Sequence, residues 1–222
     1  MLKNLSLKVI IFGFIFTFFS SFGQSFFLGI FNSSIRNELS ITHGQFGSIY
    51  ASATLLSSLI LIWIGKKIDD MHVFNYSILV IILLSFACYF FSTIKFIPFL
   101  FLGIFLLRLS GQGLMSHTAT TTISRYFEKT RGRALSVTWL GLSSAEFILP
   151  VLIIYMLSFI DWRTIWVLIS IIILFFLPIV SFFLIKKLNL SSRENSHIDH
   201  KNNSIIKQWT RLEVIKDYRF YI

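Results

Sequence analysis

The sequence predicts an all-α membrane protein with six transmembrane helices, and two observations lead to this fold class. Of the 222 residues, 55% are hydrophobic and only 14% are charged, whereas about a quarter of the residues in soluble domains are charged. Six apolar segments are each long enough to cross a bilayer, which takes about 20 residues of helix. Because hydrocarbon offers no hydrogen bonds, each segment must pair its backbone groups internally as a helix. The predicted spans are Val9–Phe31, Phe46–Ile64, Val73–Ile94, Phe96–Thr120, Ala134–Phe159 and Trp162–Ile185.

The first span has features of a secretory signal peptide, because Lys3 and Lys8 precede it. The apolar core of a signal peptide has about 7–15 residues and ends at a cleavage site of small residues. This span is longer and no such site closes it, so we expect a retained helix.

Basic residues are distributed unevenly over the predicted loops. With the amino terminus inside, only Arg36, Lys95 and Arg163 of the 20 Lys and Arg residues fall on the outer side, and Arg108 falls within the membrane. Cytoplasmic loops carry the excess of Lys and Arg, so both ends are expected in the cytoplasm and the protein in the cytoplasmic (inner) membrane. This distribution explains the net charge of +10 without nucleic acid, and the inner loops are expected to contact anionic lipid headgroups.

The segment Arg108–Pro150 organises the chain, because it joins two spans that each hold one ionisable residue. The turn between these spans is basic and contains Arg125, Lys129, Arg131 and Arg133. At 1.5 Å per residue, Arg108 and Glu146 each lie about 18 Å from this turn, near the middle of a hydrocarbon core about 30 Å thick. A charge at this depth predicts a functional site. The alternative is an Arg–Glu pair, or an arginine capped by backbone carbonyls, that only holds two helices together.

Four of the six spans carry many polar side chains, and the third and sixth are nearly pure hydrocarbon. Gln24 in the first span, Tyr50 in the second and Gln112 in the fourth are candidates to meet a substrate or proton beside Arg108 and Glu146. The first, second, fourth and fifth spans are therefore expected to face protein or a wet cavity, and the third and sixth to face lipid.

Small residues also let helices approach closely, which is the alternative role for many polar or small positions. The residues assigned to helix packing are Gly111, Gly113, Gly141 and Pro150. Pro150 and Pro178, inside the fifth and sixth spans, are expected to kink their helices.

The chain changes character after Ile185. Residues 186–208 are polar and lack periodicity, as in a cytoplasmic linker, and residues 209–222 are amphipathic, as in a helix on the inner membrane surface. The expected organisation is a six-helix bundle over residues 1–185 followed by these two segments. His197 and His200 lie in the linker, where solvated histidines are more usual than a metal site, and Cys88 has no partner. No metal and no cofactor are expected.

Five short motifs occur in order along the chain: GKKIDDMH at Gly65–His72, RLSGQG at Arg108–Gly113, RYFEKTRGRA at Arg125–Ala134, GLSSAEFILP at Gly141–Pro150 and DWR at Asp161–Arg163. Together they resemble the major facilitator superfamily (MFS) of secondary transporters, and the likeness covers nearly the whole chain. The resemblance implies the amino-terminal half of a twelve-helix transporter, a six-helix bundle built as a 3+3 repeat. Residues 186–208 then match the central loop and residues 209–222 the lead into a missing seventh helix, so a second six-helix half is an expected partner. Within the superfamily, the sequence looks closest to the monocarboxylate and oxalate/formate carriers.

The resemblance also implies a gate at the inner side. Gly65 and Asp69 match the family's signature after the second helix, although two later positions of the motif depart from it. Asp69 is implied to pair with a cation, Arg125 or Arg131, and so to close the inner side. The alternative is a solvated aspartate in a turn.

Arg108 matches the arginine of the family's helix 4 signature, which is implied to serve proton coupling or the binding of an anionic substrate. Its guanidinium can hold a carboxylate through two hydrogen bonds. Glu146 departs from the family, where a small residue is typical, and is expected to neutralise Arg108 or to carry the proton. His117, lower in the same helix, either extends a proton path or packs as a hydrogen-bonded histidine.

The leading functional interpretation is a secondary active transporter of a small solute, such as an organic anion or monocarboxylate, that works by alternating access and is coupled to protons. Two alternatives stay open: a truncated or half-size subunit without transport activity of its own, and an exporter of drugs or other solutes in the same superfamily. An intramembrane enzyme is not expected, because the sequence lacks HExxH and GxSxG motifs and a Ser–His pair at one depth.

Overall fold

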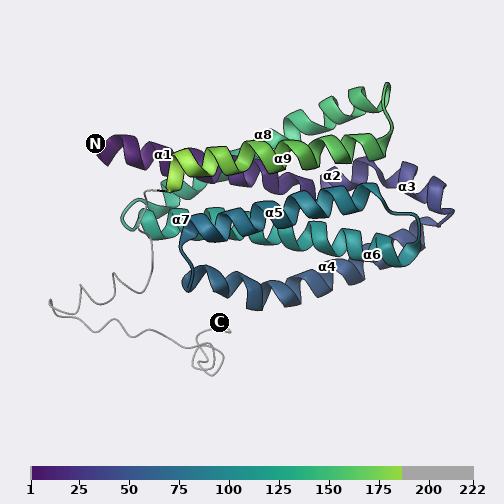
Figure 1. Ribbon diagram of the computed structural model, residues 1–222, viewed down its shortest axis with the longest axis horizontal. Coiled ribbons are helices and arrows are strands. Elements are labelled where there is room, and N and C mark those ends of the chain that lie inside the picture. The colour runs from purple at the N-terminus through teal and green to yellow at the C-terminus, as the bar shows by residue number, and fades with distance from the viewer. Residues whose placement is uncertain (1, 187–222) are drawn as a thin grey trace. The chain divides into compact units, whose positions relative to one another are not determined.

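The computed structural model describes residues 2–186, with side chains from Ser6 onward, and this part of the chain is helical without any strand (Figure 1). Six helices in it are long and apolar enough to cross a membrane, as the sequence predicts. Their ranges are Ser6–Ile30, His43–Asp69, Val73–Ser92, Ile97–Tyr126, Arg131–Leu157 and Trp162–Ile185. The expected amphipathic segment at 209–222 and nearly all of the expected linker at 186–208 lie outside the described residues.

The six spans run back and forth, so their connections gather at two ends of the bundle (Figure 1). One end carries the α4–α5 and α7–α8 turns with Lys66, Lys67, Lys129 and Arg131, and we term it the basic end. The opposite end carries the α3–α4, α5–α6 and α8–α9 turns. The elements are α1 (Leu2–Phe19), η1 (Ser20–Gly23), α2 (Ser25–Ile30), α3 (Asn32–Leu39), α4 (His43–Lys66), η2 (Lys67–Asp69), α5 (Val73–Ser92), α6 (Ile97–Leu107), η3 (Arg108–Met115), α7 (Ser116–Tyr126), α8 (Arg131–Leu157) and α9 (Trp162–Ile185).

The first span is not one continuous helix. The 3₁₀ turn η1 follows α1, and Gln24 then adopts an extended conformation with φ −83° and ψ 155° before α2 begins. No proline lies at this break, but Ser20, Ser21 and Gly23 do, and combinations of Gly and Ser are a common site of helix kinks. At the break, Gly23 closely approaches the fourth span.

The fourth span changes its helix type in the middle. Between α6 and α7, the eight residues of η3 form a π-helix, which is rare and often marks functional sites. Arg108 is its first residue, so the predicted buried charge stands where the helical register changes.

The second span begins with a complete capping box. The Thr42 hydroxyl accepts a hydrogen bond from the Gln45 N–H at 3.2 Å, and the Gln45 side chain accepts one from the Thr42 N–H at 2.8 Å. Ser40, just before this cap, has a left-handed φ of 53°. The two reciprocal bonds fix where α4 starts and therefore which of its residues reach the middle of the bundle.

Burial bears on the expectation that the first, second, fourth and fifth spans face protein or a wet cavity and the third and sixth face lipid. Half of the most apolar stretch of α5 is buried (50%), whereas α4 and α8 have only 11% and 22% buried. Helices α5 and α9 pack along each other, and Ser85 and Ser170 hydrogen-bond across this contact with an Oγ–Oγ distance of 3.0 Å. The expectation was wrong for the third span, which packs half of this stretch against protein, because the apolar character of a span does not state which element covers it.

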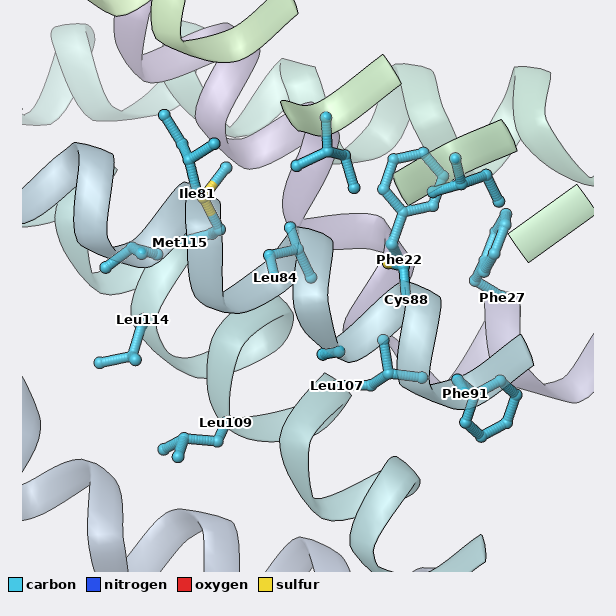
Figure 2. Packing of buried hydrophobic residues seen from close by; sticks show 14 of the residues in the cluster. Phe22, Phe27, Ile81, Leu84, Cys88, Phe91, Leu107, Leu109, Leu114 and Met115 are labelled. Carbon is cyan, nitrogen blue, oxygen red and sulfur yellow. The ribbon is translucent and has the colours of Figure 1, made fainter. Parts of the chain in front are cut away.

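The core between the spans is made of large apolar side chains, several of which are shown in Figure 2. Trp166 lies at its aromatic part, with ring centroids 5.4 Å from Phe27, 5.2 Å from Phe31 and 4.7 Å from Phe91. These side chains come from α2, the start of α3, α5 and α9. Aromatic pairs at such separations contribute about 0.5–1.5 kcal/mol each beyond burial, so they fasten the part of the first span beyond its break.

A polar cluster closes the bundle at the opposite end. Glu38 accepts hydrogen bonds from the Trp162 indole at 3.0 Å and from Arg163 at 2.5 Å. The Arg163 guanidinium also donates to the Ser92 carbonyl at 2.5 Å and to the Ile94 carbonyl. One arginine thus ties α3, the end of α5 and the start of α9 together.

Candidate functional site

The candidate site is built where the first and fourth spans cross without side chains between them. A Cβ atom added at Gly111 would lie 2.6 Å from the Gly23 nitrogen and 2.8 Å from its Cα, and one at Gly23 would meet the backbone of Leu107 and Gln112. Real Cβ atoms essentially never approach other atoms so closely, so only glycine fits at both positions. The backbone contact brings the break of the first span against the π-helix of the fourth.

Arg108 forms a hydrogen bond across this backbone crossing. Its side chain is buried, with only 8% of the residue exposed, and its Nη1 donates to the Gly23 carbonyl at 3.1 Å. The guanidinium carbon lies 5.2 Å from the centroid of the Tyr50 ring, a distance at which a cation is attracted to the ring face. In residues 2–186 the ion pairs are Arg125–Asp69 and Arg163–Glu38, so Arg108 faces no carboxylate there.

Arg108 Nε and the hydroxyl of Tyr50, whose ring lies near the Arg108 guanidinium, are buried without a hydrogen-bond partner within the described part of the chain, and so is Thr54 Oγ1. Tyr50 and Thr54 are one turn apart on α4, which packs against η3. Buried polar groups are normally paired, so these atoms are free to bind a ligand with oxygen acceptors. The sequence interpretation named Tyr50 but not Thr54, whose only signal was its spacing of four from Tyr50 on a helix.

Gln24 and Gln112 lie on the two sides of the same crossing. Gln24 is the extended residue of the break in the first span, and its N–H donates to the Ser21 carbonyl at 2.9 Å. Gln112 follows Gly111 in η3, and both glutamine side chains are half-buried. The structure therefore brings Gln24, Tyr50, Arg108 and Gln112 into one region.

Glu146 does not belong to this region as an ion-pair partner. It lies on α8 and is exposed, next to Phe147, which is 83% exposed. The expectation that Glu146 neutralises Arg108 is therefore wrong for this structure. Counting residues from the basic turn gives the depth of a side chain but not the side of the helix on which it lies.

Asp69 meets Arg125 at the basic end. The Arg125 guanidinium forms an ion pair with the Asp69 carboxylate and donates a second hydrogen bond to the Ile68 carbonyl at 3.2 Å. Of the two cations expected to pair with Asp69, Arg131 instead donates to the Ser124 carbonyl at 3.2 Å. The carboxyl end of α7 is thus fastened to the turn between α4 and α5.

Gly65 and His117 form a second contact between the second and fourth spans. His117 Nε2 lies 3.1 Å from the Gly65 carbonyl oxygen, near the end of α4, where the backbone carbonyls favour a hydrogen-bond donor. A Cβ atom at Gly65 would lie 3.4 Å from His117 Nε2. The sequence alternative of a hydrogen-bonded, packed histidine matches this geometry.

The other residues assigned to packing have different surroundings. A Cβ atom at Gly141 would run into the Phe14 carbonyl and the Thr17 hydroxyl, so α8 touches the backbone of α1 there. A Cβ atom at Gly113 would meet the flexible end of Leu61 at 3.2 Å and the Arg108 carbonyl oxygen at 3.4 Å. Helix α8 continues through Pro150 without a break.

No group of three or more His, Cys, Asp or Glu side chains that suits a metal ion occurs in residues 2–186. His197 and His200 lie outside the described residues. Cys88 is buried in α5.

The comparison with protein families supports the interpretation of these motifs. The family model described as Major Facilitator Superfamily matches residues 13–220, which is nearly the whole chain. Comparison with curated proteins gave no significant match. Members of this superfamily are transporters, and the six apolar helices agree with a multi-pass membrane protein. The chain, with its glycine crossing beside a buried arginine, belongs to the Major Facilitator Superfamily.

Proposed function

We propose that this secondary transporter carries a small organic anion, such as a monocarboxylate, and that Arg108 binds its carboxylate. The supporting observation is a buried guanidinium that faces no carboxylate in the described part of the chain. A charge within the hydrocarbon core costs at least about 2.5–3.5 kcal/mol, and an anionic substrate would offset part of this cost. A bound anionic substrate would neutralise the charge of Arg108, which no carboxylate of the described residues neutralises.

The unpartnered atoms support a ligand with two oxygen acceptors. Arg108 Nε and the Tyr50 hydroxyl are both buried donors without an acceptor among residues 2–186. A carboxylate has two oxygens and accepts charge-assisted hydrogen bonds that are about twice as strong as neutral ones. Gln24 and Gln112 lie at the same crossing and complete the proposed binding residues.

Transport by alternating access requires a gate, and we assign it to the basic end. The Asp69–Arg125 pair and the Gly65–His117 contact both join α7 to the end of the second span. Breaking them frees the end of α7, the helix that continues directly from the π-helix of the site. In this proposal the basic end and the amino terminus both face the cytoplasm, and the protein lies in the inner membrane.

Two further components belong to the proposal. Glu146 carries the coupled proton, since it is a carboxylate within a membrane span, where ionisable residues are commonly functional. A second six-helix bundle covers the exposed faces of α4 and α8. Ser52 and Ser58 lie on the exposed face of α4. A chain that shows no uptake by itself would then need this bundle.

The test of the substrate class is uptake of radiolabelled monocarboxylates into proteoliposomes. Arg108→Lys keeps the positive charge but loses the fork that holds two oxygens, so uptake should fall at least tenfold, about the effect of one charged hydrogen bond. Arg36→Lys, a matched change at the opposite end, should leave uptake unchanged. Equal uptake by both variants would refute the role of Arg108.

The gate is tested separately with a cysteine introduced at Thr120 of α7, between the site and the Asp69–Arg125 pair. Asp69→Asn should increase labelling of this cysteine by a water-soluble maleimide, and Asp69→Glu should not. Identical labelling in the two variants would refute the gate and leave the binding site untouched. Proton coupling is tested by Glu146→Gln, which should abolish the stimulation of uptake by an inward proton gradient, with Glu128→Gln as the control.

A further inference from the structure

A second candidate binding site lies on the outside of the bundle. Its residues are distant in sequence from the Arg108 crossing and differ from it in chemical character. It is a groove of about 320 Å³ between α5 and α9, close to the basic end. Its lining is entirely apolar and consists of Phe74, Ile78, Pro178, Ile179, Phe182 and Phe183. None of these residues belongs to the proposed transport site.

The groove opens to the surface of two membrane-spanning helices. Ile179 is 58% exposed and Phe183 is 69% exposed, and both belong to the span Trp162–Ile185. An apolar surface within a membrane span meets hydrocarbon chains rather than water. The material that fills the groove is therefore an acyl chain or another apolar helix.

A positive charge stands at the basic end of this groove. The Lys186 ammonium lies 4.1 Å from the centroid of the Phe182 ring, and Phe182 is one of the lining residues. Lys186 is exposed and follows the last residue of α9. Helix α5 begins at Val73 beside the same end, and Phe74 of its first turn lines the groove.

The groove has a positive charge at the basic end and apolar side chains deeper in the span, which is the arrangement that a phospholipid fits. From Lys186 back to Pro178 the helix covers eight residues, or about 12 Å at 1.5 Å per residue. A phospholipid has its phosphate at the membrane surface and its acyl chains directed towards the middle. We infer that this groove binds an anionic phospholipid, with the phosphate beside Lys186 and one acyl chain along Ile179 and Phe182.

Charge complementarity favours this occupant over a second copy of the chain. A helix from another copy would leave Lys186 without an anion, whereas a phosphate pairs with it. One lysine near an anionic membrane surface contributes about 1 kcal/mol, which corresponds to about a fivefold preference for anionic lipid. The inference is independent of the transported substrate.

The experiment is native mass spectrometry of the full chain, purified in detergent and mixed with phosphatidylglycerol or with phosphatidylcholine of identical acyl chains. The wild type should retain about fivefold more phosphatidylglycerol than phosphatidylcholine. Lys186→Gln should abolish this preference, and Lys95→Gln, which removes a lysine at the opposite end, should not. Equal retention of the two lipids by the wild type would refute the inference.

A second pair of variants tests the groove itself. Ile179→Trp places a large ring in the groove and should lower the retention of phosphatidylglycerol to the level of Lys186→Gln. Ile172→Trp, two turns away on α9 and outside the groove, should retain as much lipid as the wild type. If Ile179→Trp keeps its lipid, or instead converts a dimer into a monomer, the groove holds something other than a phospholipid.

Discussion

Replacing Gly111 by alanine tests the crossing on which the site is built. The new Cβ would lie 2.6 Å from the Gly23 nitrogen, and ordinary contact begins at 3.4 Å, so the two backbones must separate by about 0.8 Å. Both partners of this contact are backbone, which cannot rotate away as a side chain does. The same movement lengthens the 3.1 Å bond from Arg108 to the Gly23 carbonyl beyond hydrogen-bond range.

The size of the effect follows from these two changes. Overpacking of a tight contact costs about 1–3 kcal/mol, and a hydrogen bond to a charged group contributes about 1.5–3 kcal/mol. Alanine regains up to about 1 kcal/mol in a helix relative to glycine. We therefore expect Gly111→Ala to lower the free energy of unfolding by about 1.5–5 kcal/mol. For a chain of this size that lowers the unfolding temperature by about 3–20 °C.

Gly113→Ala is the matched control, because it makes the same substitution two residues further along the same π-helix. Its Cβ would meet the two methyl groups of Leu61 at 3.2 and 3.3 Å, which a side-chain rotation relieves, and the Arg108 carbonyl oxygen at 3.4 Å, where ordinary contact begins. The assay uses Cys88, the single cysteine of the chain, which is buried and becomes reactive towards a fluorogenic maleimide only when the protein unfolds. If the two alanine variants unfold at the same temperature, the crossing is not the tight backbone contact described above.

Three further predictions follow from the ends of the spans. Arg163→Met removes the donor shared by two carbonyls at the opposite end and should lower the unfolding temperature in the same thiol assay, whereas an unchanged temperature would show that the cluster contributes nothing. The hydrogen bond from the Thr164 hydroxyl, with further bonds from backbone N–H groups, lowers the pKa of Asp161, so the stability from this cap is present above the unfolded pKa of about 4 and is lost as the pH falls through the lower folded pKa. Thermal unfolding from about pH 6 to about pH 3 should therefore show a loss that Asp161→Asn lacks. His117→Phe removes the hydrogen bond to the Gly65 carbonyl and should increase maleimide labelling of a cysteine introduced at Thr120. Labelling equal to that of the protein with His117 intact would exclude His117 from the gate.

The six spans could be predicted from the sequence because each is an apolar run of membrane length, and length and hydropathy are properties of single segments. The motifs similarly placed Asp69 near a cation, since each residue lies in a turn at the same end. Of the two expected partners, the structure selects Arg125, whose position at the end of α7 faces the α4–α5 turn.

Three features could not be predicted because they depend on contacts between distant segments. The break at Gln24 contains no proline and lies at the backbone contact between Gly23 and Gly111, which are far apart in sequence. Glu146 lies at the expected distance along its helix but on an exposed face, which residue counting cannot determine. Arg163 reaches Ser92, 71 positions away, through a side-chain direction that no local pattern encodes.

The most direct test of the central claim is equilibrium binding of a monocarboxylate to the purified protein, with and without the Arg108 fork. Isothermal titration calorimetry of the wild type should show saturable binding that Arg108→Lys weakens at least tenfold, while Gly113→Ala binds as the wild type does. Binding of equal strength in the wild type and Arg108→Lys would contradict the account, because the buried guanidinium would then not hold the anion.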